Sequence, residues 1–275
     1  MRWNRDYNSS NVEDRRSEGG AGLGGGGGGI PLGGLLAVAS RFGWKGILVA
    51  LVVVGVMMFG GNLCTGPGGG ERAVDPGPAA VETGDSELTH LVGFVLDDVN
   101  HTWHEQLSGY QDTRLVLFRN AIRSACGTAT TAVGPFYCQV DHKVYIDLGF
   151  YDELRRRFGA PGDFAQAYVI AHEVGHHVQN LRQLLGRGEV SSVEIELQAD
   201  CLAGAWANSA DKRGLVEVGD VDEALNAASQ IGDDTIQKKT TGHVQPETFT
   251  HGSAAQRSAA FRRGYQGGAA ACGIR

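Results

Sequence analysis

The sequence predicts an α+β protein that is mostly helical, carries a small antiparallel sheet and is preceded by a single transmembrane helix. Three observations support this prediction. Residues 46–63 form an uncharged, largely apolar run, and residues 143–150 alternate apolar and polar side chains as a strand does. From residue 163 to about residue 210 the chain is compatible with helix, apart from one break that contains glycine.

Composition limits both the size of the folded domain and its partners. Glycine accounts for 42 of the 275 residues, and many of these glycines lie before residue 70, where they cannot contribute side chains to a core. The folded part is therefore shorter than the chain, although the remainder is long enough to bury a sizeable core. The formal net charge of −7 argues against a nucleic-acid-binding surface, so we expect no nucleic-acid partner.

The first 45 residues are polar and then dominated by glycine, which predicts a disordered segment. Residues 46–63 follow and contain no charged side chain. Their length is at the short end of the roughly 17–25 apolar residues that a bilayer-spanning helix needs. A cleaved signal peptide would lie closer to the start of the chain, and a buried core helix would have only glycine-rich flanks to pack against. We therefore expect one transmembrane helix that attaches the protein to the lipid bilayer.

The charges on either side of this apolar run predict its orientation. Arg41 and Lys45 precede it, whereas acidic side chains predominate after it. The positive-inside rule then predicts a single-pass protein of the cell membrane, with residues 1–45 in the cytoplasm and the later residues outside it. Residues 64–88 contain three prolines and further glycines, which predicts a flexible linker. We expect the folded domain to comprise residues 89–275.

The folded domain is expected to begin with an amphipathic helix, because apolar side chains recur at helical spacing from Leu91 to Trp103. The apolar residues 115–118 predict a strand. Residues 143–150 predict a second strand, since their apolar side chains share one face.

Four later helices are predicted from N-cap residues at the start of helix-compatible segments. These caps are Asp163, Ser191, Asp220 and Ser253. At Ser191 and Asp220 an acidic residue three positions later completes the pattern of a capping box. The first of these helices is expected to end near Gly186, and the second near residue 210.

Four cysteines follow Cys64, and this even number allows two disulfide bonds in a domain outside the cytoplasm. Three pairings are possible, of which we prefer Cys126–Cys138 together with Cys201–Cys272. Buried free thiols are the alternative interpretation of the same residues.

A HExxH motif at residues 172–176 predicts the chemistry. His172 and His176 are four residues apart, so on a helix both imidazoles face one point, a spacing that suits two ligands of one Zn2+ ion. Glu173 lies beside them, where its carboxylate can act on metal-bound water without ligating the metal. The helix is otherwise largely apolar, and burying these three side chains would be costly unless a metal satisfied them. The alternative is a pair of core histidines hydrogen-bonded to the backbone.

A catalytic zinc site usually has three protein ligands and one water. The extended pattern HExxHxxGxxH would supply a third histidine, but its last position here is Arg182. Glu196 on the next helix is the preferred third ligand, and Glu194, which suits the capping box, is its rival. Asp200 shares a face with Glu196 and can accept a hydrogen bond from the second ring nitrogen of His172. The competing interpretation of Glu196 and Asp200 is a solvated acidic face.

These motifs resemble those of known peptidases. HExxH followed on a second helix by ExxxD is similar to the gluzincin class of thermolysin-like peptidases. Several segments resemble the bacterial neutral zinc metallopeptidase family more closely, namely residues 126–127, 134–138, 162–179, 196–206, 231–234 and 249–257. The resemblance covers nearly all of the chain from about residue 90, and the glycine-rich start with its single anchor is also similar. It implies a thermolysin-like zincin core in the form of a minimal gluzincin, with zinc as cofactor, but no particular substrate.

The motifs and the resemblance together predict a membrane-anchored zinc metallopeptidase that hydrolyses peptide bonds in a protein or peptide substrate. Glu173 would take a proton from zinc-bound water and return it to the leaving amine. His251 is the first candidate for a hydrogen-bond donor to the developing oxyanion, with His243 and Tyr145 in reserve. A surface histidine without a catalytic role is the alternative for His251. The strand at residues 143–150 could also pair with an extended substrate.

Two other functions fit the same motifs. One is a non-catalytic zinc-binding scaffold of the cell envelope. Glu173 argues against it, because a purely structural site has no use for a base beside an open coordination position. The other is a zinc amidase that acts on cell-wall peptide, against which the sequence offers little.

Overall fold

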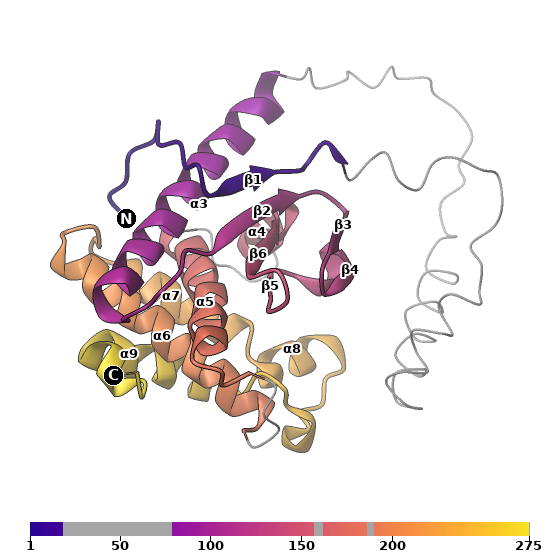
Figure 1. The fold of residues 1–275 in the computed structure, drawn as a ribbon. Helices are drawn as coiled ribbons and strands as arrows, with labels where there is room; N and C mark the ends of the chain where they lie inside the picture. Colours follow the sequence, from indigo (N-terminus) through magenta and orange to yellow (C-terminus); the bar gives the residue numbers. More distant parts are fainter. Residues whose placement is uncertain (19–78, 157–161, 186–189, 275) are drawn as a thin grey trace, which may run out of the picture. The chain divides into compact units, whose positions relative to one another are not determined.

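The computed structural model describes residues 1–18, 79–156, 162–185 and 190–274, and in these residues helices predominate over strands (Figure 1). This confirms the mixed α+β, mostly helical class predicted from the sequence. The elements, in chain order, are β1 (Val12–Asp14), α3 (Ala79–Gln106), β2 (Arg114–Phe118), β3 (Ala121–Ser124), β4 (Gly127–Thr130), η3 (Thr131–Val133), β5 (Phe136–Cys138), β6 (Lys143–Asp147), α4 (Gly149–Arg156), α5 (Asp163–Leu181), α6 (Ser192–Lys212), α7 (Asp220–Gln230), α8 (Asp233–Thr240), η4 (Pro246–Thr248) and α9 (Ala254–Ala271).

The main sheet has four strands in the order β1-β2-β6-β5. Strands β1, β2 and β6 are parallel to one another, and only β5 is antiparallel to its neighbour β6. The prediction of an antiparallel sheet is therefore wrong for most of this sheet, although β3 and β4 do form a separate antiparallel pair. The cause lies in residues 119–142, which contain β3, β4 and β5 and are long enough to return the chain to the same end of the sheet.

Strand β6 is an interior strand, because β2 and β5 occupy its two edges. The proposal that residues 143–150 could pair with a substrate is therefore wrong. The strand is also shorter than predicted, since helix α4 begins at Gly149. The edge strand on this side of the sheet is β5, whose second edge has no strand neighbour among the described residues.

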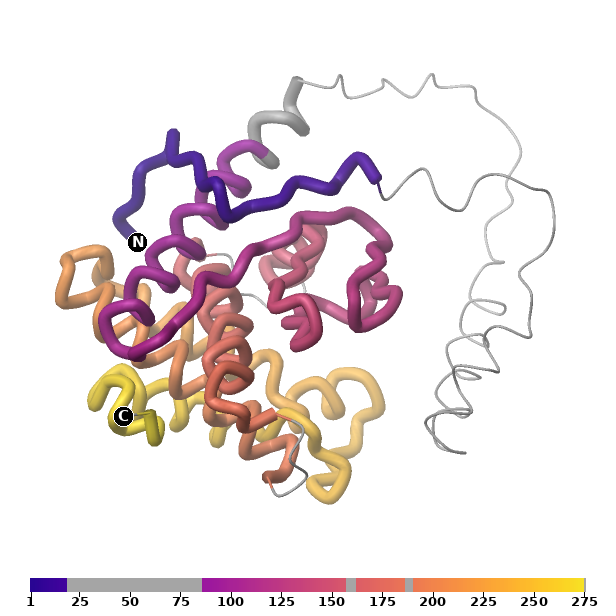
Figure 2. The backbone as a smooth tube through the Cα atoms, in the orientation of Figure 1, coloured from indigo at the N-terminus to yellow at the C-terminus, as the bar shows by residue number. Residues whose placement is uncertain are grey.

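Residues 1–18 form an ordered N-terminal arm, which corrects the prediction that residues 1–45 are disordered. Figure 2 shows the arm running past helix α3 and alongside β2. Val12 in β1 lies opposite Leu115 in β2, and Tyr7 and Asn11 donate hydrogen bonds of 2.9 and 2.8 Å to the Asp97 carboxylate of α3. This arm could not be predicted, because a strand of three residues is too short to show a period and the hydrogen bonds that anchor the arm are long-range.

Helix α3 begins at Ala79, so residues 79–88 are helical rather than part of a flexible linker. Pro78 immediately precedes this start, and no proline interrupts the chain from Ala79 to the end of the helix. The predicted transmembrane helix at residues 46–63, the rest of the linker and residues 19–45 lie outside the described residues. Among the helices that are described, none combines the length and the apolar character needed to cross a bilayer.

The helices pack closely around α5. Helix α5 contacts helices α3, α6 and α7, and it also contacts strands β5 and β6. Gly175 of α5 packs against Ala199 of α6, where an added Cβ would lie 3.1 Å from the Ala199 backbone. Helices α6 and α9 cross even more closely, because a Cβ at Gly204 or Gly264 would overlap a backbone carbonyl of the opposite helix. These contacts fix the faces of α5, α6 and α9 relative to one another.

Several predicted helix ends and both preferred disulfides are confirmed. Ser191 with Glu194 and Ser253 with Gln256 form complete capping boxes. The other two predicted caps are displaced by one residue, since Gly162 and Gly219 precede α5 and α7. Helix α5 ends at Leu181, before the predicted stop at Gly186. The disulfides join Cys126 to Cys138 and Cys201 to Cys272, the second of which ties α6 to the end of α9.

Replacing Asp97 with Leu should release the N-terminal arm. The change removes the acceptor of both the Tyr7 and the Asn11 hydrogen bonds, which we expect to lower the free energy of unfolding by about 2 kcal/mol. Trypsin should then cut faster at Arg15 or Arg16 in the arm, which limited proteolysis followed by mass spectrometry would detect. The control is Asp112→Leu, which removes only the exposed ion pair with His104. Equal cleavage of the two variants would contradict the anchoring role of Asp97.

Candidate metal centre

The HExxH residues of α5 line a cavity of about 630 Å3. Glu196 of α6 lines the same cavity, as do two residues from the C-terminal part of the chain, His251 and Arg257. Helix α5 is buried along most of its length, and His172 and Glu173 are only 6% and 7% exposed. The cavity is thus the place where polar side chains of the buried helix meet polar side chains of the elements packed on it.

Three of these side chains direct potential metal ligands at one point. His172 Nε2 lies 3.2 Å from one Glu196 oxygen, and His176 Nε2 lies 3.5 Å from the other. One ligand atom from each of the three residues falls within 4.8 Å of the other two. The structure therefore brings together the three residues that the sequence predicted as ligands. Glu194, the rival ligand, instead completes the capping box at the start of α6.

Hydrogen bonds orient both imidazole rings with Nε2 toward this point. His172 Nδ1 lies 2.8 Å from the Asp200 carboxylate, which as an ionised group can only accept, so Nδ1 carries the hydrogen. His176 Nδ1 lies 2.8 Å from Oε1 of Gln179. The Gln179 amide has a defined orientation, because its nitrogen donates to the Ile195 carbonyl at 2.7 Å. In both rings Nδ1 is therefore the nitrogen engaged in orienting the side chain, and Nε2 is the nitrogen that can ligate a metal once it has released its proton.

Asp200 is completely buried and belongs to a larger network. Arg257 of α9 donates to its two carboxylate oxygens, from Nε at 2.8 Å and from a terminal nitrogen at 3.0 Å. The Tyr168 hydroxyl donates to Asp200 Oδ1 at 2.5 Å, and Arg257 also reaches the Ile231 carbonyl at 3.2 Å. The network thus fixes the carboxylate that in turn orients His172.

The electrostatics of the cluster favour a cation. Burial alone would raise the pKa of Glu196, but its hydrogen bond with His172 and nearby positive charge outweigh burial and lower this pKa to about 2. Burial would likewise raise the pKa of Asp200, but Arg257 and His172 keep it well below its usual range. Burial by itself would lower the pKa of His172, whereas Asp200 and Glu196 raise it to about 10. Two ionised carboxylates therefore face His172, and a divalent cation can replace the proton that they stabilise there.

The chain matches the sequence model of the family described as "Putative neutral zinc metallopeptidase" over residues 1–273. It belongs to this family. The match includes the N-terminal arm, whereas the quoted motifs of the resemblance all lie beyond residue 90 and only general features of the start were similar. Recognition of the family from its motifs is thereby confirmed.

Two relatives match the chain over different shares of its length. The protein YpfJ of Escherichia coli K12 is 42% identical over 286 aligned residues, which cover 98% of this chain and 96% of YpfJ. The protein Rv2575 of Mycobacterium tuberculosis H37Rv is 45% identical over 190 residues, which cover 62% of this chain and 65% of Rv2575. No solved structure matches the chain.

In this family member Glu173 sits in the cavity beside the convergent ligands but outside the ligand set. Burial raises the pKa of its carboxyl group, and the nearby histidines only partly offset this effect. A carboxylate whose pKa is raised toward neutrality is a better proton acceptor than an exposed one.

His251 lies on the cavity wall and is held by Asp233, the first residue of α8. One Asp233 oxygen accepts from the backbone N–H groups of Thr250, His251 and Gly252, at 2.7, 2.7 and 3.0 Å. The other lies 3.1 Å from His251 Nδ1. The reserve candidates are elsewhere: His243 is exposed, and Tyr145 is buried with its hydroxyl bonded to Asp141.

The sequence did not identify Gln179, Tyr168 or Arg257 as residues of the site. A signal existed for Gln179, which follows His176 by three residues and so shares its helical face. Arg257 closes the last of the family-like segments quoted above, but nothing local links it to Asp200, which precedes it by 57 residues.

Proposed function

We propose that this protein is a zinc-dependent metallopeptidase that hydrolyses peptide bonds in protein or peptide substrates. The observation that carries the proposal is the convergence of His172, His176 and Glu196 on one point, with Glu173 beside them in an accessible cavity. Membership of a zinc metallopeptidase family supports the same function. We further propose that helices α5 and α6 form a minimal gluzincin core related to thermolysin.

The residues present fit zinc well. Two neutral imidazoles and one carboxylate are a ligand set that zinc uses in catalytic sites, and a set of three leaves a coordination position open. Asp200 and Gln179 hold the two rings in the tautomer that ligation needs. When bound, zinc supplies the Lewis acidity and the acidified water that peptide hydrolysis at neutral pH requires.

The chain's own residues would then move the protons and stabilise charge. Glu173 is positioned to accept a proton on its carboxylate and to return it to the nitrogen of the leaving amine. His251, oriented by Asp233, can donate a hydrogen bond to the carbonyl oxygen as negative charge develops there. The low exposure of His172 and Glu173 strengthens these interactions, because little solvent screens the charges.

Edge strand β5 is the best candidate for holding an extended substrate. Phe136 and Tyr137 of this strand line the cavity, and β6 pairs with only one of its edges. A peptide added along the free edge would receive main-chain hydrogen bonds next to the metal ligands.

Attachment to the cell membrane through residues 46–63 is also part of the proposal, and rests on the sequence alone.

Loss of metal should abolish peptide cleavage. We expect the full-length protein to hold about one zinc ion per chain, to lose casein cleavage on dialysis against a chelator, and to regain it on addition of zinc. Glu196→Ala should weaken zinc binding by more than the roughly 10–100-fold typical of losing an outer hydrogen-bond partner. Zinc affinity can be measured by competition with a chelating dye.

Glu194→Ala is the matched control, since it lies two residues away and removes only the capping box. It should lower stability slightly through loss of the capping box and leave zinc affinity unchanged. The opposite pattern, with zinc lost on changing Glu194 and kept on changing Glu196, would show that Glu196 is not the third ligand. A protein that holds zinc and cleaves only cell-wall peptide would be an amidase, and one that holds zinc and cleaves neither substrate would be a scaffold.

A further inference from the structure

We propose that Tyr137, His177 and Asn180 form a positioning bridge that fixes edge strand β5 on helix α5, and so sets where an extended peptide lies relative to the metal ligands. This inference rests on the proposed function, because it concerns how the same site receives its substrate. None of the three residues is a predicted ligand or proton carrier: Tyr137 belongs to β5, and His177 and Asn180 belong to α5.

The bridge is a chain of hydrogen bonds with one direction. His177 Nε2 lies 2.7 Å from the Gln111 carbonyl, which can only accept, so Nε2 carries the hydrogen. Nδ1 of the neutral ring then accepts from the Tyr137 hydroxyl at 2.9 Å. The Asn180 amide nitrogen donates to the same hydroxyl oxygen at 2.9 Å. Both ring nitrogens of His177 and the Tyr137 hydroxyl therefore have partners, and reversing the bond between the two residues would leave one of these groups without its partner.

Within a single turn, helix α5 presents one histidine to the metal site and another to strand β5. His176 directs its Nε2 toward Glu196, while His177, one step around the helix, points to β5. His177 is completely buried and has the rings of Tyr110, Tyr137 and His142 around it at centroid distances of 5.4–5.8 Å. The ring therefore has little freedom, so the strand it holds is fixed relative to the ligand next to it.

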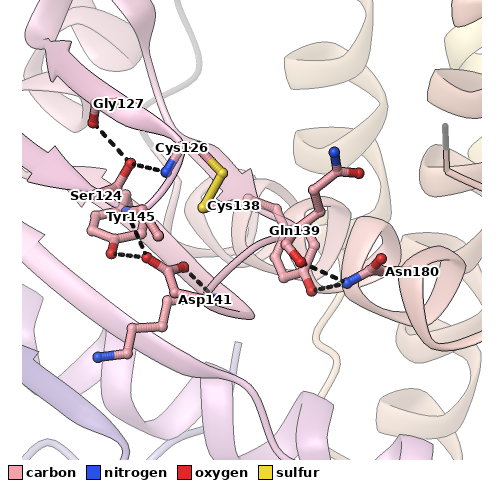
Figure 3. Close-up of a disulfide and its surroundings, with 11 residues drawn as sticks. Ser124, Cys126, Gly127, Cys138, Gln139, Asp141, Tyr145 and Asn180 are labelled. Atoms are coloured by element: carbon pink, nitrogen blue, oxygen red, sulfur yellow. Dashed lines mark hydrogen bonds between the residues drawn. A yellow bond between two sulfur atoms is a disulfide. The ribbon is translucent and has the colours of Figure 1, made fainter.

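Strand β5 is attached at its far end as well. Cys138 is bonded to Cys126 of the β3–β4 turn, and the Asn180 amide also donates to the Gln139 carbonyl at 3.2 Å (Figure 3). Phe136, at the start of the strand, stacks on Tyr145 of β6 with a centroid distance of 4.9 Å. The bridge is thus the connection between a strand that is braced within its own sheet and the helix that bears the metal ligands.

Loosening the bridge should have an effect that depends on substrate length. In Tyr137→Phe the ring stays and the hydroxyl is lost, so β5 should become mobile over α5. We expect KM for a long quenched-fluorescence peptide to rise about tenfold and kcat to change less than about twofold. A blocked dipeptide amide, too short to reach from the metal ligands along β5, should keep its KM. Asn180→Ala should act in the same way, and the two changes together should be less than additive.

Tyr265→Phe is the matched control, because it removes a tyrosine hydrogen bond, to Asp211, that lies outside the cavity. It should leave both substrates unaffected. Zinc content is measured for each full-length variant, and we expect it to be unchanged. Hydrogen exchange gives a reading that does not depend on activity: in Tyr137→Phe, exchange should rise in residues 133–139 and not in α5.

The outcomes separate this inference from the proposed function. Equal losses for the long and short substrates, or unchanged exchange in residues 133–139, would overturn the bridge while leaving the peptidase intact. A wild-type protein that holds zinc but cleaves neither substrate would overturn the proposed function, and exchange alone would then decide whether the bridge holds β5.

Discussion

Replacing Glu173 with Gln should lower kcat for peptide hydrolysis by about 10³-fold and leave bound zinc in place. Glutamine has nearly the same size and shape, but its amide cannot take up a proton from water. Glu173 is only 7% exposed and is not one of the three convergent ligands, so the change should disturb neither packing nor metal binding. Steady-state cleavage of a peptide substrate and elemental analysis of the same sample measure the two effects together.

Glu153→Gln is the control for this experiment, since it makes the same chemical change at an exposed position of α4. It should retain the wild-type kcat. Cleavage by Glu173→Gln at the rate of the control would remove Glu173 from the mechanism. Loss of zinc from Glu173→Gln would instead indicate that its carboxylate is a ligand.

The largest expected effect on stability is that of Arg257→Met. This change removes the guanidinium that holds both oxygens of the completely buried Asp200 carboxylate. A buried charge left without its partner typically costs about 3–5 kcal/mol, and we expect the free energy of unfolding to fall by that amount. Zinc affinity should fall as well, because Asp200 then holds His172 less firmly. Denaturant unfolding and dye competition measure the two quantities.

Two further variants test whether the loss of stability comes from the ion pair between Arg257 and Asp200. Arg262→Met alters an exposed arginine of the same helix and should change stability by no more than about 0.5 kcal/mol. Arg257→Lys keeps the charge but loses the two-pronged geometry, and should fall between the other two. If Arg257→Met were no less stable than Arg262→Met, the ion pair with Asp200 would have no role in holding the site.

The convergence of the metal ligands could be predicted because it rests on local geometry. A spacing of four residues places His172 with His176, and Glu196 with Asp200, on common faces of their helices. Burial of both helices then leaves few places for these polar faces except against each other. The capping box at Ser191 was predictable for the same reason, since it is completed within four residues. The box predicted at Asp220 does not form, because Gly219 is the cap of α7.

The rest of the fold and of the site depends on which helices and strands pack together. The periodicity of the sequence does not contain that information. The pairing of Arg257 with Asp200 requires α9 to cross α6 at a pair of glycines, Gly204 and Gly264. The parallel direction of β2 and β6 follows from the path of the chain between them, not from either strand. The tyrosine that bonds to His177 comes from a strand of three residues, which is too short to show a pattern.

The pairing of β1 with β2 has a consequence for membrane topology. Their backbones lie side by side from Val12 to Asp14, so residues 1–18 and the helices beyond Ala79 must fold on the same side of any lipid bilayer. A chain that crossed the bilayer once between these segments would hold them on opposite sides. Insertion of residues 46–63 is compatible with this sheet only if the polypeptide returns to the face from which it entered. Strand β1 and the candidate metal centre therefore lie in one compartment.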